Sequence, residues 1–171
     1  MKNWLRLGVV MAVVTTASAC STSHVYLVRH AEKRNESDTS TLTPAGQLRA
    51  EALARELASV RFDSILSTPY RRTQLTAAPL ATQQKLPVRT YAPHPTSVVL
   101  KRVGHLRGKT TLVVGHSNTL LEIAKGLGAN PSLQKIEAGD YDNLFHLTIR
   151  RRPFGTSVTL DERTFGVPTA P

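Results

Sequence analysis

Two histidines and two arginines in this chain are placed where they could act on a phosphoryl group. Arg29 and His30 directly follow the apolar run at residues 25–28, and His116 closely follows a second apolar run. The neighbours Arg71 and Arg72 lie in a polar segment between them, and one of the two is the second arginine. Open α/β sheets bind ligands beyond the carboxyl ends of their strands, so we expect these side chains to share one site. An imidazole can attack phosphorus while fixed positive charge stabilises the transition state, which indicates phosphoryl-transfer chemistry.

His30 is the candidate nucleophile of this site. A neutral imidazole can hold the phosphoryl group as phosphohistidine and so divide one difficult transfer into two easier steps. Arg29 and one of the two neighbours Arg71 and Arg72 are the candidates for binding the phosphoryl oxygens, because a planar guanidinium offers paired donors that a lysine cannot imitate.

Four segments at residues 29–33, 42–46, 67–73 and 113–119 follow one another in a recognisable order. Together they resemble the histidine phosphatase (phosphoglycerate-mutase-like) superfamily, whose signature is Arg-His-Gly followed much later by Gly-His. The resemblance covers most of the chain after about residue 24. Ala31 stands where the family usually has Gly, and the run Arg-His-Ala-Glu-Lys is similar to a bacterial subgroup.

The resemblance implies a phosphatase and selects among the basic residues. Residues 72–77 match the family pattern Arg-x-x-x-Thr-Ala, which implies that Arg72 rather than Arg71 binds phosphate. His116 corresponds to the second histidine of the family and is implied to donate to the transferring phosphoryl group. The positive amino end of a helix predicted from residue 117 would lie near it.

The general acid is the point at which the chain departs from the family. A carboxylate between the second arginine and the second histidine commonly protonates the leaving group, but no Asp or Glu occurs from Thr73 to Gly115. Glu32 is therefore the predicted acid, with His94 and the loop residues Asp140 and Asp142 as alternatives. A substrate with a good leaving group, such as a phosphoramidate or an anhydride, would need no strong acid.

Apolar runs and helical periodicity alternate along the chain, which predicts an α/β fold. We expect a three-layer α/β/α sandwich with a mostly parallel central sheet, in one domain over residues 25–171, like the histidine phosphatases. The expected strands lie at residues 25–29, 62–67, 87–91, 110–114, 144–149 and 157–160. The expected helices lie at residues 43–59, 70–84, 97–103 and 117–127.

The first 24 residues are typical of an exported and lipid-anchored protein. Residues 1–19 are predicted to be a signal peptide, with a basic start, an apolar stretch and a small-x-small cleavage site. Cys20 follows that site and resembles the lipidated cysteine of a bacterial lipobox, so residues 20–24 are expected to be a lipidated tether. The predicted location is the periplasm, on the outer membrane through this lipid. Plain secretion or a soluble periplasmic form is the alternative.

Charge and composition limit the partners. The chain carries a net charge of +10, which suits an anionic substrate such as a phosphorylated small molecule or an envelope glycan or lipid. Nucleic acid is not expected, because no nucleic-acid motif is present and only 5% of residues are aromatic. No metal site or cofactor is predicted, since the histidine spacing fits no zinc site and no dinucleotide glycine pattern occurs. The alternative function is a non-catalytic protein that binds phosphate or lipopolysaccharide.

Overall fold

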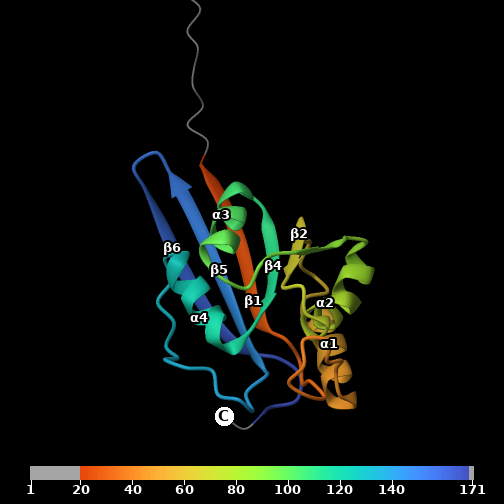
Figure 1. The fold of residues 1–171 in the computed structure, drawn as a ribbon. Coiled ribbons are helices and arrows are strands. Elements are labelled where there is room, and N and C mark those ends of the chain that lie inside the picture. The colour runs from red at the N-terminus through yellow and green to blue at the C-terminus, as the bar shows by residue number, and fades with distance from the viewer. Residues whose placement is uncertain (1–19, 170–171) are drawn as a thin grey trace, which may run out of the picture.

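A computed structural model describes residues 20–169, so the signal peptide predicted for residues 1–19 lies outside the described part (Figure 1). A six-stranded sheet runs through the middle of the domain in the order β3-β2-β4-β1-β5-β6. The strands β1 to β4 pair in parallel, β5 pairs antiparallel with β1, and β6 pairs antiparallel with β5. The bounds are β1 (Ser21–Arg29), β2 (Ser64–Ser67), β3 (Val88–Thr90), β4 (Thr110–Gly115), β5 (Asn143–Arg152) and β6 (Gly155–Thr164).

Two pairs of helices cover the two faces of this sheet. On one face lie α1 (Pro44–Glu56) and α2 (Arg71–Gln84), and on the other lie α3 (Ser97–His105) and α4 (Ser117–Gly126). The predicted three-layer sandwich with a mostly parallel sheet is thus confirmed. Among the described residues, no helix is both long and apolar enough to span a membrane.

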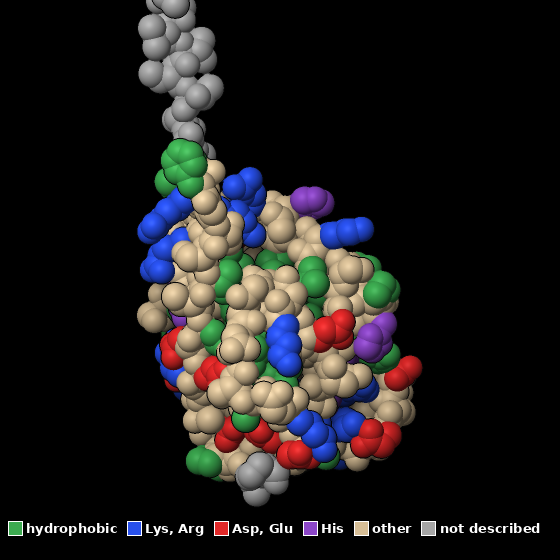
Figure 2. Space-filling view, turned by 90° about the vertical axis from the view of Figure 1, so that its left-hand side faces the viewer, with side chains coloured by type: hydrophobic (Ala, Val, Ile, Leu, Met, Phe, Trp, Pro, Cys, Tyr) green, Lys and Arg blue, Asp and Glu red, His purple; other side chains and the backbone are tan. Residues whose placement is uncertain are grey.

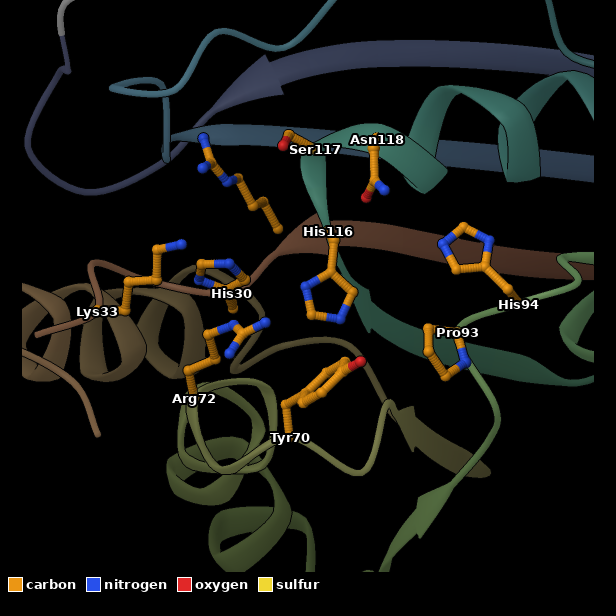
Figure 3. A pocket seen from close by; sticks show the side chains of 10 residues that line it. His30, Lys33, Tyr70, Arg72, Pro93, His94, His116, Ser117 and Asn118 are labelled. Carbon is orange, nitrogen blue, oxygen red and sulfur yellow. The ribbon is translucent and has the colours of Figure 1, made fainter. Parts of the chain in front are cut away.

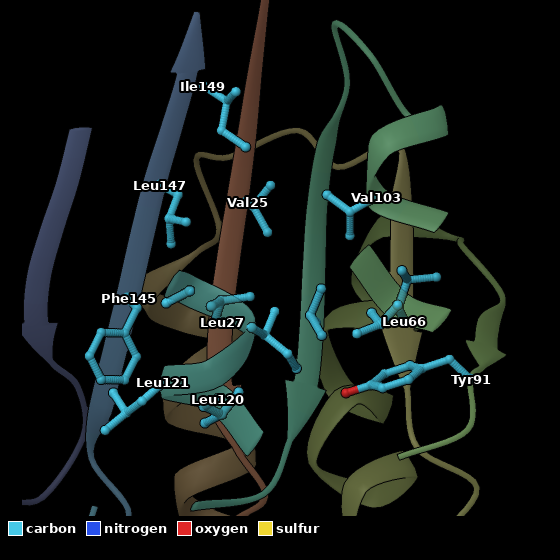
Figure 4. Packing of buried hydrophobic residues seen from close by; sticks show 14 of the residues in the cluster. Val25, Leu27, Leu66, Tyr91, Val103, Leu120, Leu121, Phe145, Leu147 and Ile149 are labelled. Atoms are coloured by element: carbon cyan, nitrogen blue, oxygen red, sulfur yellow. The ribbon is translucent and has the colours of Figure 1, made fainter. Parts of the chain in front are cut away.

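The central strand β1 is buried on both sides because successive side chains point to opposite faces. Val25 and Leu27 pack into the cluster formed with α3 and α4, which Figure 4 shows together with Phe145 of β5. Tyr26 and Val28 pack into the second cluster, formed with α1 and α2. Both clusters and every described helix and strand lie between Ser21 and Phe165, so a chain that begins at Ser21 contains the whole described fold.

The amino end of β1 corrects the predicted tether. Ser21 to His24 are the first residues of β1, not a free linker, and they pair with residues 148–151 near the carboxyl end of β5. Ser23 is buried, and its hydroxyl accepts a hydrogen bond from the Gly108 backbone N–H at 2.9 Å. The sequence hides this because the four residues are polar, and the strand is extended by pairing with a long antiparallel neighbour.

The loop after β1 meets the start of α1 at a very close approach. The Glu32 carbonyl accepts from the Thr43 backbone N–H at 2.9 Å, and the Thr43 hydroxyl caps α1 by accepting from the Gly46 N–H at 3.0 Å. A Cβ atom on Gly46 would lie 2.3 Å from the Glu32 carbonyl oxygen. Gly46 is therefore required where α1 packs against the loop that carries His30.

Replacing Gly46 by Ala should destabilise the fold, because the added methyl group meets backbone that must move. We expect a loss of about 1–3 kcal/mol in the free energy of unfolding, measured by chemical denaturation. Gly104→Ala is the matched control in α3, where a Cβ meets no atom within 4 Å. It should be neutral or stabilising by up to about 1 kcal/mol. Equal stability of the two variants would contradict the close approach.

Candidate active site

A cavity of about 230 Å³ opens at the carboxyl ends of β1 and β4 (Figure 3). Its lining is strongly basic, and none of the described residues that line it is an Asp or a Glu. The lining residues are Arg29, His30, Lys33, Tyr70, Arg72, Pro93, His94, His116, Ser117 and Asn118. The structure thus brings the four basic residues singled out from the sequence to one place.

Parallel pairing of the two central strands sets the two histidines side by side. Arg29 on β1 is in register with Gly115 on β4, and the His30 backbone N–H donates to the Gly115 carbonyl at 3.0 Å. Each histidine is the next residue after its strand. Their ring centroids are consequently 5.4 Å apart, with the rings in an edge-to-face arrangement.

His30 is held as a neutral imidazole with one nitrogen free. Its Nδ1 lies 2.8 Å from the Ala31 carbonyl oxygen, which can only accept, so Nδ1 carries the proton and Nε2 keeps its lone pair. Burial lowers the pKa of His30 to about 3, against the opposing hydrogen bond to Ala31, and the positive charge of Arg29 and Arg72 lowers it further. The imidazole is therefore neutral at neutral pH and has the free lone pair that a nucleophile requires.

Both arginines are clamped by backbone carbonyls at one guanidinium nitrogen. A terminal N–H group of Arg29 donates to the Glu137 and Asp140 carbonyls at 2.7 and 2.8 Å, and its guanidinium lies 4.1 Å from the ring centroid of Tyr141. Arg72 is held in the same way: a terminal N–H group donates to the Ser37 carbonyl at 3.0 Å, and the guanidinium lies over the ring of Tyr70. These contacts fix the two guanidinium groups before any ligand arrives.

The Nε atoms of Arg29 and Arg72 are buried and have no hydrogen-bond partner among the described residues. A buried donor without a partner costs about 1–3 kcal/mol, and more when it belongs to a charged group. Both belong to residues that line one cavity, beside the free nitrogen of His30. The cavity thus combines two arginines that have unsatisfied donors with an imidazole that has a free nitrogen, and this arrangement suits an anion.

His116 is positioned by a chain of hydroxyl groups. Its Nε2 lies 2.9 Å from the Thr68 hydroxyl, which lies 2.8 Å from the Thr73 hydroxyl. The Thr68 contact occupies Nε2, so Nδ1 is the nitrogen that remains for a ligand. Burial, with the charges of Arg72 and Arg29, lowers the pKa of His116 to about 4. His116 is also the N-cap residue of α4, whose free backbone N–H groups favour an anion at this point.

Glu32 is not in the cavity, which corrects its predicted role as the general acid. Its carboxylate accepts from Arg49 Nε at 2.9 and 3.0 Å and from a terminal nitrogen of Arg49 at 2.8 Å. Arg49 is buried and also donates to the carbonyls of Phe165 and Val167. The pair ties the loop after β1 to α1 and to the carboxyl-terminal segment, and this use of Glu32 is structural.

The loop carboxylates named as alternatives are also engaged elsewhere. Asp142 is buried and accepts from the Thr169 backbone N–H at 2.7 Å, and Asp140 lies 3.5 Å from the Thr169 hydroxyl. Neither residue lines the cavity. His94 does line it, so among the predicted acids it is the one that the structure brings to the site.

Sequence reasoning did not single out several residues of the site. Lys33, Tyr70 and Asn118 line the cavity, although each lies within one of the four segments that carried the resemblance. Their proximity to a predicted site residue was the available signal. Arg71 is exposed and does not line the cavity, whereas Arg72 is buried there. In the described part of the chain, no group of three His, Cys, Asp or Glu side chains is arranged to hold a metal ion.

A sequence model of the histidine phosphatase superfamily (branch 1) matches residues 25–92, which include Arg29, His30 and Arg72. Comparison with curated protein sequences finds no match. The family match covers less than half of the chain. His116 lies beyond the matched stretch, and only the pairing of β4 with β1 places it beside His30.

Solved structures of histidine phosphatase type share the fold. The mycobacterial glucosyl-3-phosphoglycerate phosphatase has a TM-score of 0.66 at 15% identity, over 82% of this chain and 97% of that one. A Nakamurella multipartitia protein assigned as the phosphohistidine phosphatase SixA has 0.59 at 18% identity, over 88% and 98%. An Escherichia coli protein assigned as an alpha-ribazole-5'-P phosphatase has 0.59 at 18% identity, over 85% and 98%. At these identities the likeness is one of fold.

Glu32→Gln should lower stability, because it leaves the buried Arg49 guanidinium without its carboxylate. We expect a loss of about 3 kcal/mol in the free energy of unfolding, measured by denaturant titration. Glu36→Gln is the matched control, because the Glu36 side chain is 88% exposed and pairs only with Lys33. It should stay within about 0.5 kcal/mol of the wild type. A Glu32→Gln variant as stable as the control would argue against the structural role.

Proposed function

We propose that this protein is a phosphatase that forms a phosphohistidine intermediate on His30. One observation carries the proposal: the buried Nε donors of Arg29 and Arg72 have no partner among the described residues, and both arginines line the cavity that holds the free nitrogen of His30. Such an arrangement suits a phosphoryl group, whose oxygens take charge-assisted hydrogen bonds while an imidazole attacks the phosphorus.

The proposed reaction has two steps. His30 Nε2 attacks phosphorus, a nitrogen–phosphorus bond forms, and the bond to the leaving group breaks with its electron pair. The Nδ1 proton stays on the hydrogen bond to Ala31 throughout. Water then attacks the phosphorus of phosphohistidine, and the nitrogen–phosphorus bond breaks with its electron pair returning to Nε2. Inorganic phosphate departs with both protons of that water, and neutral His30 is restored. Arg29, Arg72 and His116 hold the phosphoryl oxygens in both steps, where charge develops in the transition state.

The absence of a carboxylate from the described cavity lining suggests the class of substrate. Without an Asp or Glu to protonate it, the leaving group must be stable as it departs, or take its proton from His94 or water. Aryl phosphates, phosphoramidates and anhydrides fit this requirement better than alkyl esters. The likeness to a protein assigned as a phosphohistidine phosphatase, whose substrate name describes a phosphoramidate, supports the same class.

We further propose that the protein works in the bacterial envelope, as a periplasmic lipoprotein anchored through Cys20. The signal-like sequence of residues 1–19 and the lipobox-like cysteine support this. Cys20 is exposed and directly precedes β1, so a modified residue at this position would not disturb the core. A soluble periplasmic or secreted form is the alternative.

His30→Ala should abolish phosphatase turnover, because it removes the imidazole whose free Nε2 attacks phosphorus in the proposed mechanism. We expect a fall on the order of 10⁴-fold or more in kcat with para-nitrophenyl phosphate, measured by release of the phenolate. His105→Ala is the matched control, since His105 is exposed at the end of α3 and lies outside the cavity. Near-normal turnover by His30→Ala would contradict the proposed mechanism.

Rates should depend steeply on the leaving group. We expect para-nitrophenyl phosphate and a phosphoramidate to be hydrolysed far faster than an alkyl phosphate, because nothing in the described cavity is a strong acid. Similar rates across the series would contradict an acid-poor site.

The missing carboxylate also favours a second function, in which the same cavity binds phosphate without turnover. Tight binding of inorganic phosphate with no hydrolysis of any substrate would assign that function instead.

A further inference from the structure

The end of the domain opposite the cavity has a basic surface with an aromatic tip. It is formed where β1 begins, between the turn that joins β5 to β6 and the loop that joins α3 to β4. We call it the amino-end face. Its residues are Arg107, Lys109, Arg150, Arg151, Arg152 and Phe154, around Ser21. Figure 2 shows basic side chains gathered at this end, whereas the acidic side chains visible from that side lie lower.

The positive charge of this face is hardly compensated. Arg150 and Arg152 are exposed, and among the described residues neither they nor Arg107 take part in an ion pair. Lys109 alone has a carboxylate, 3.1 Å away on Asp63. From residue 150 to residue 160 the hairpin contains no acidic residue. This concentration of unpaired charge is complementary to an anionic surface.

Phe154 adds an apolar group to the most protruding part of the same face. It lies in the turn between Arg152 and Gly155 and is fully exposed, at 102%. Single exposed apolar residues are common and mean little alone. A phenyl ring beside three arginines is the composition of segments that lie in a lipid interface, where the ring enters the headgroup region and the cations contact phosphates.

The chain itself enters the fold through the middle of this face. Ser21 pairs with Arg151, and the Ser23 hydroxyl contacts both the Gly108 backbone N–H and the Arg151 side chain, at 2.9 and 3.3 Å. Cys20 directly precedes Ser21, so it lies at this face, where β1 begins between the hairpin and the α3–β4 loop. A lipid on Cys20, as proposed above, would bring the amino-end face to the same membrane.

We propose that the amino-end face binds the surface of an anionic lipid membrane. Arg150 and Arg152 contact lipid phosphates, and Phe154 inserts at headgroup depth. The phosphatase cavity lies at the opposite end of β1, and nine residues of strand separate the two ends by about 27 Å. Membrane binding therefore turns the cavity toward the aqueous phase, away from the lipids of the same surface.

The test uses the chain from Ser21 onward, which contains the whole described fold and has no lipid. Its binding is measured by flotation with vesicles of phosphatidylcholine alone or mixed with phosphatidylglycerol. We expect binding only to the anionic vesicles, weakened by added salt. Arg150→Gln with Arg152→Gln should weaken it on the order of 10-fold or more. Phe154→Ser should also weaken it, and at high salt its effect should persist.

Two matched variants separate this face from general charge and apolarity. Lys85→Gln with Arg89→Gln removes two exposed cations at the β3 edge, and Leu48→Ser removes an exposed apolar side chain from α1. Neither should alter vesicle binding. Equal losses in the control and test variants would overturn the proposal, as would equal binding to neutral and anionic vesicles. Binding to soluble heparin but not to vesicles would assign a polyanion partner and overturn the lipid surface.

Discussion

The parallel pairing of β1 with β4 is the constraint on which the proposed chemistry depends. Register between Arg29 and Gly115 makes the two strands end together, and the next residue on each is a histidine. The hydrogen bond from the His30 N–H to the Gly115 carbonyl continues the ladder one residue beyond β1. A shift of this register would turn each side chain to the other face and separate the two imidazoles.

The cavity brings two arginines together, and none of the described residues that line it is an Asp or a Glu. The neutral histidines and the backbone carbonyls make this concentration of positive charge tolerable. Burial keeps both histidines neutral by lowering the pKa of each, which removes two charges that would otherwise repel the arginines. Backbone carbonyls take up part of the guanidinium donors and fix their direction. The Nε donors of both arginines are left without a hydrogen-bond partner among the described residues. Binding a phosphoryl group would offset the free-energy cost of burying these donors unpaired.

Sequence predicted well what strand ends and motifs determine, and poorly what depends on distant chain segments. The four basic residues follow from local patterns, and parallel strands bring such patterns together. Glu32 was misassigned because its partner Arg49 is anchored by the carboxyl-terminal segment around Phe165, which has no marked pattern. The start of β1 was misread as a tether because pairing with β5, not local composition, makes Ser21 to His24 a strand.

The central claim is that His30 carries the phosphoryl group during turnover. The most direct measurement is to mix enzyme with a ³²P-labelled aryl phosphate, stop the reaction with base within one turnover, and locate the label by mass spectrometry of peptides. Phosphohistidine is stable in base and labile in acid, so the account predicts an acid-labile label on the peptide that contains His30, and none in His30→Ala. Label on another residue, or turnover with no labelled enzyme at any time, would contradict it.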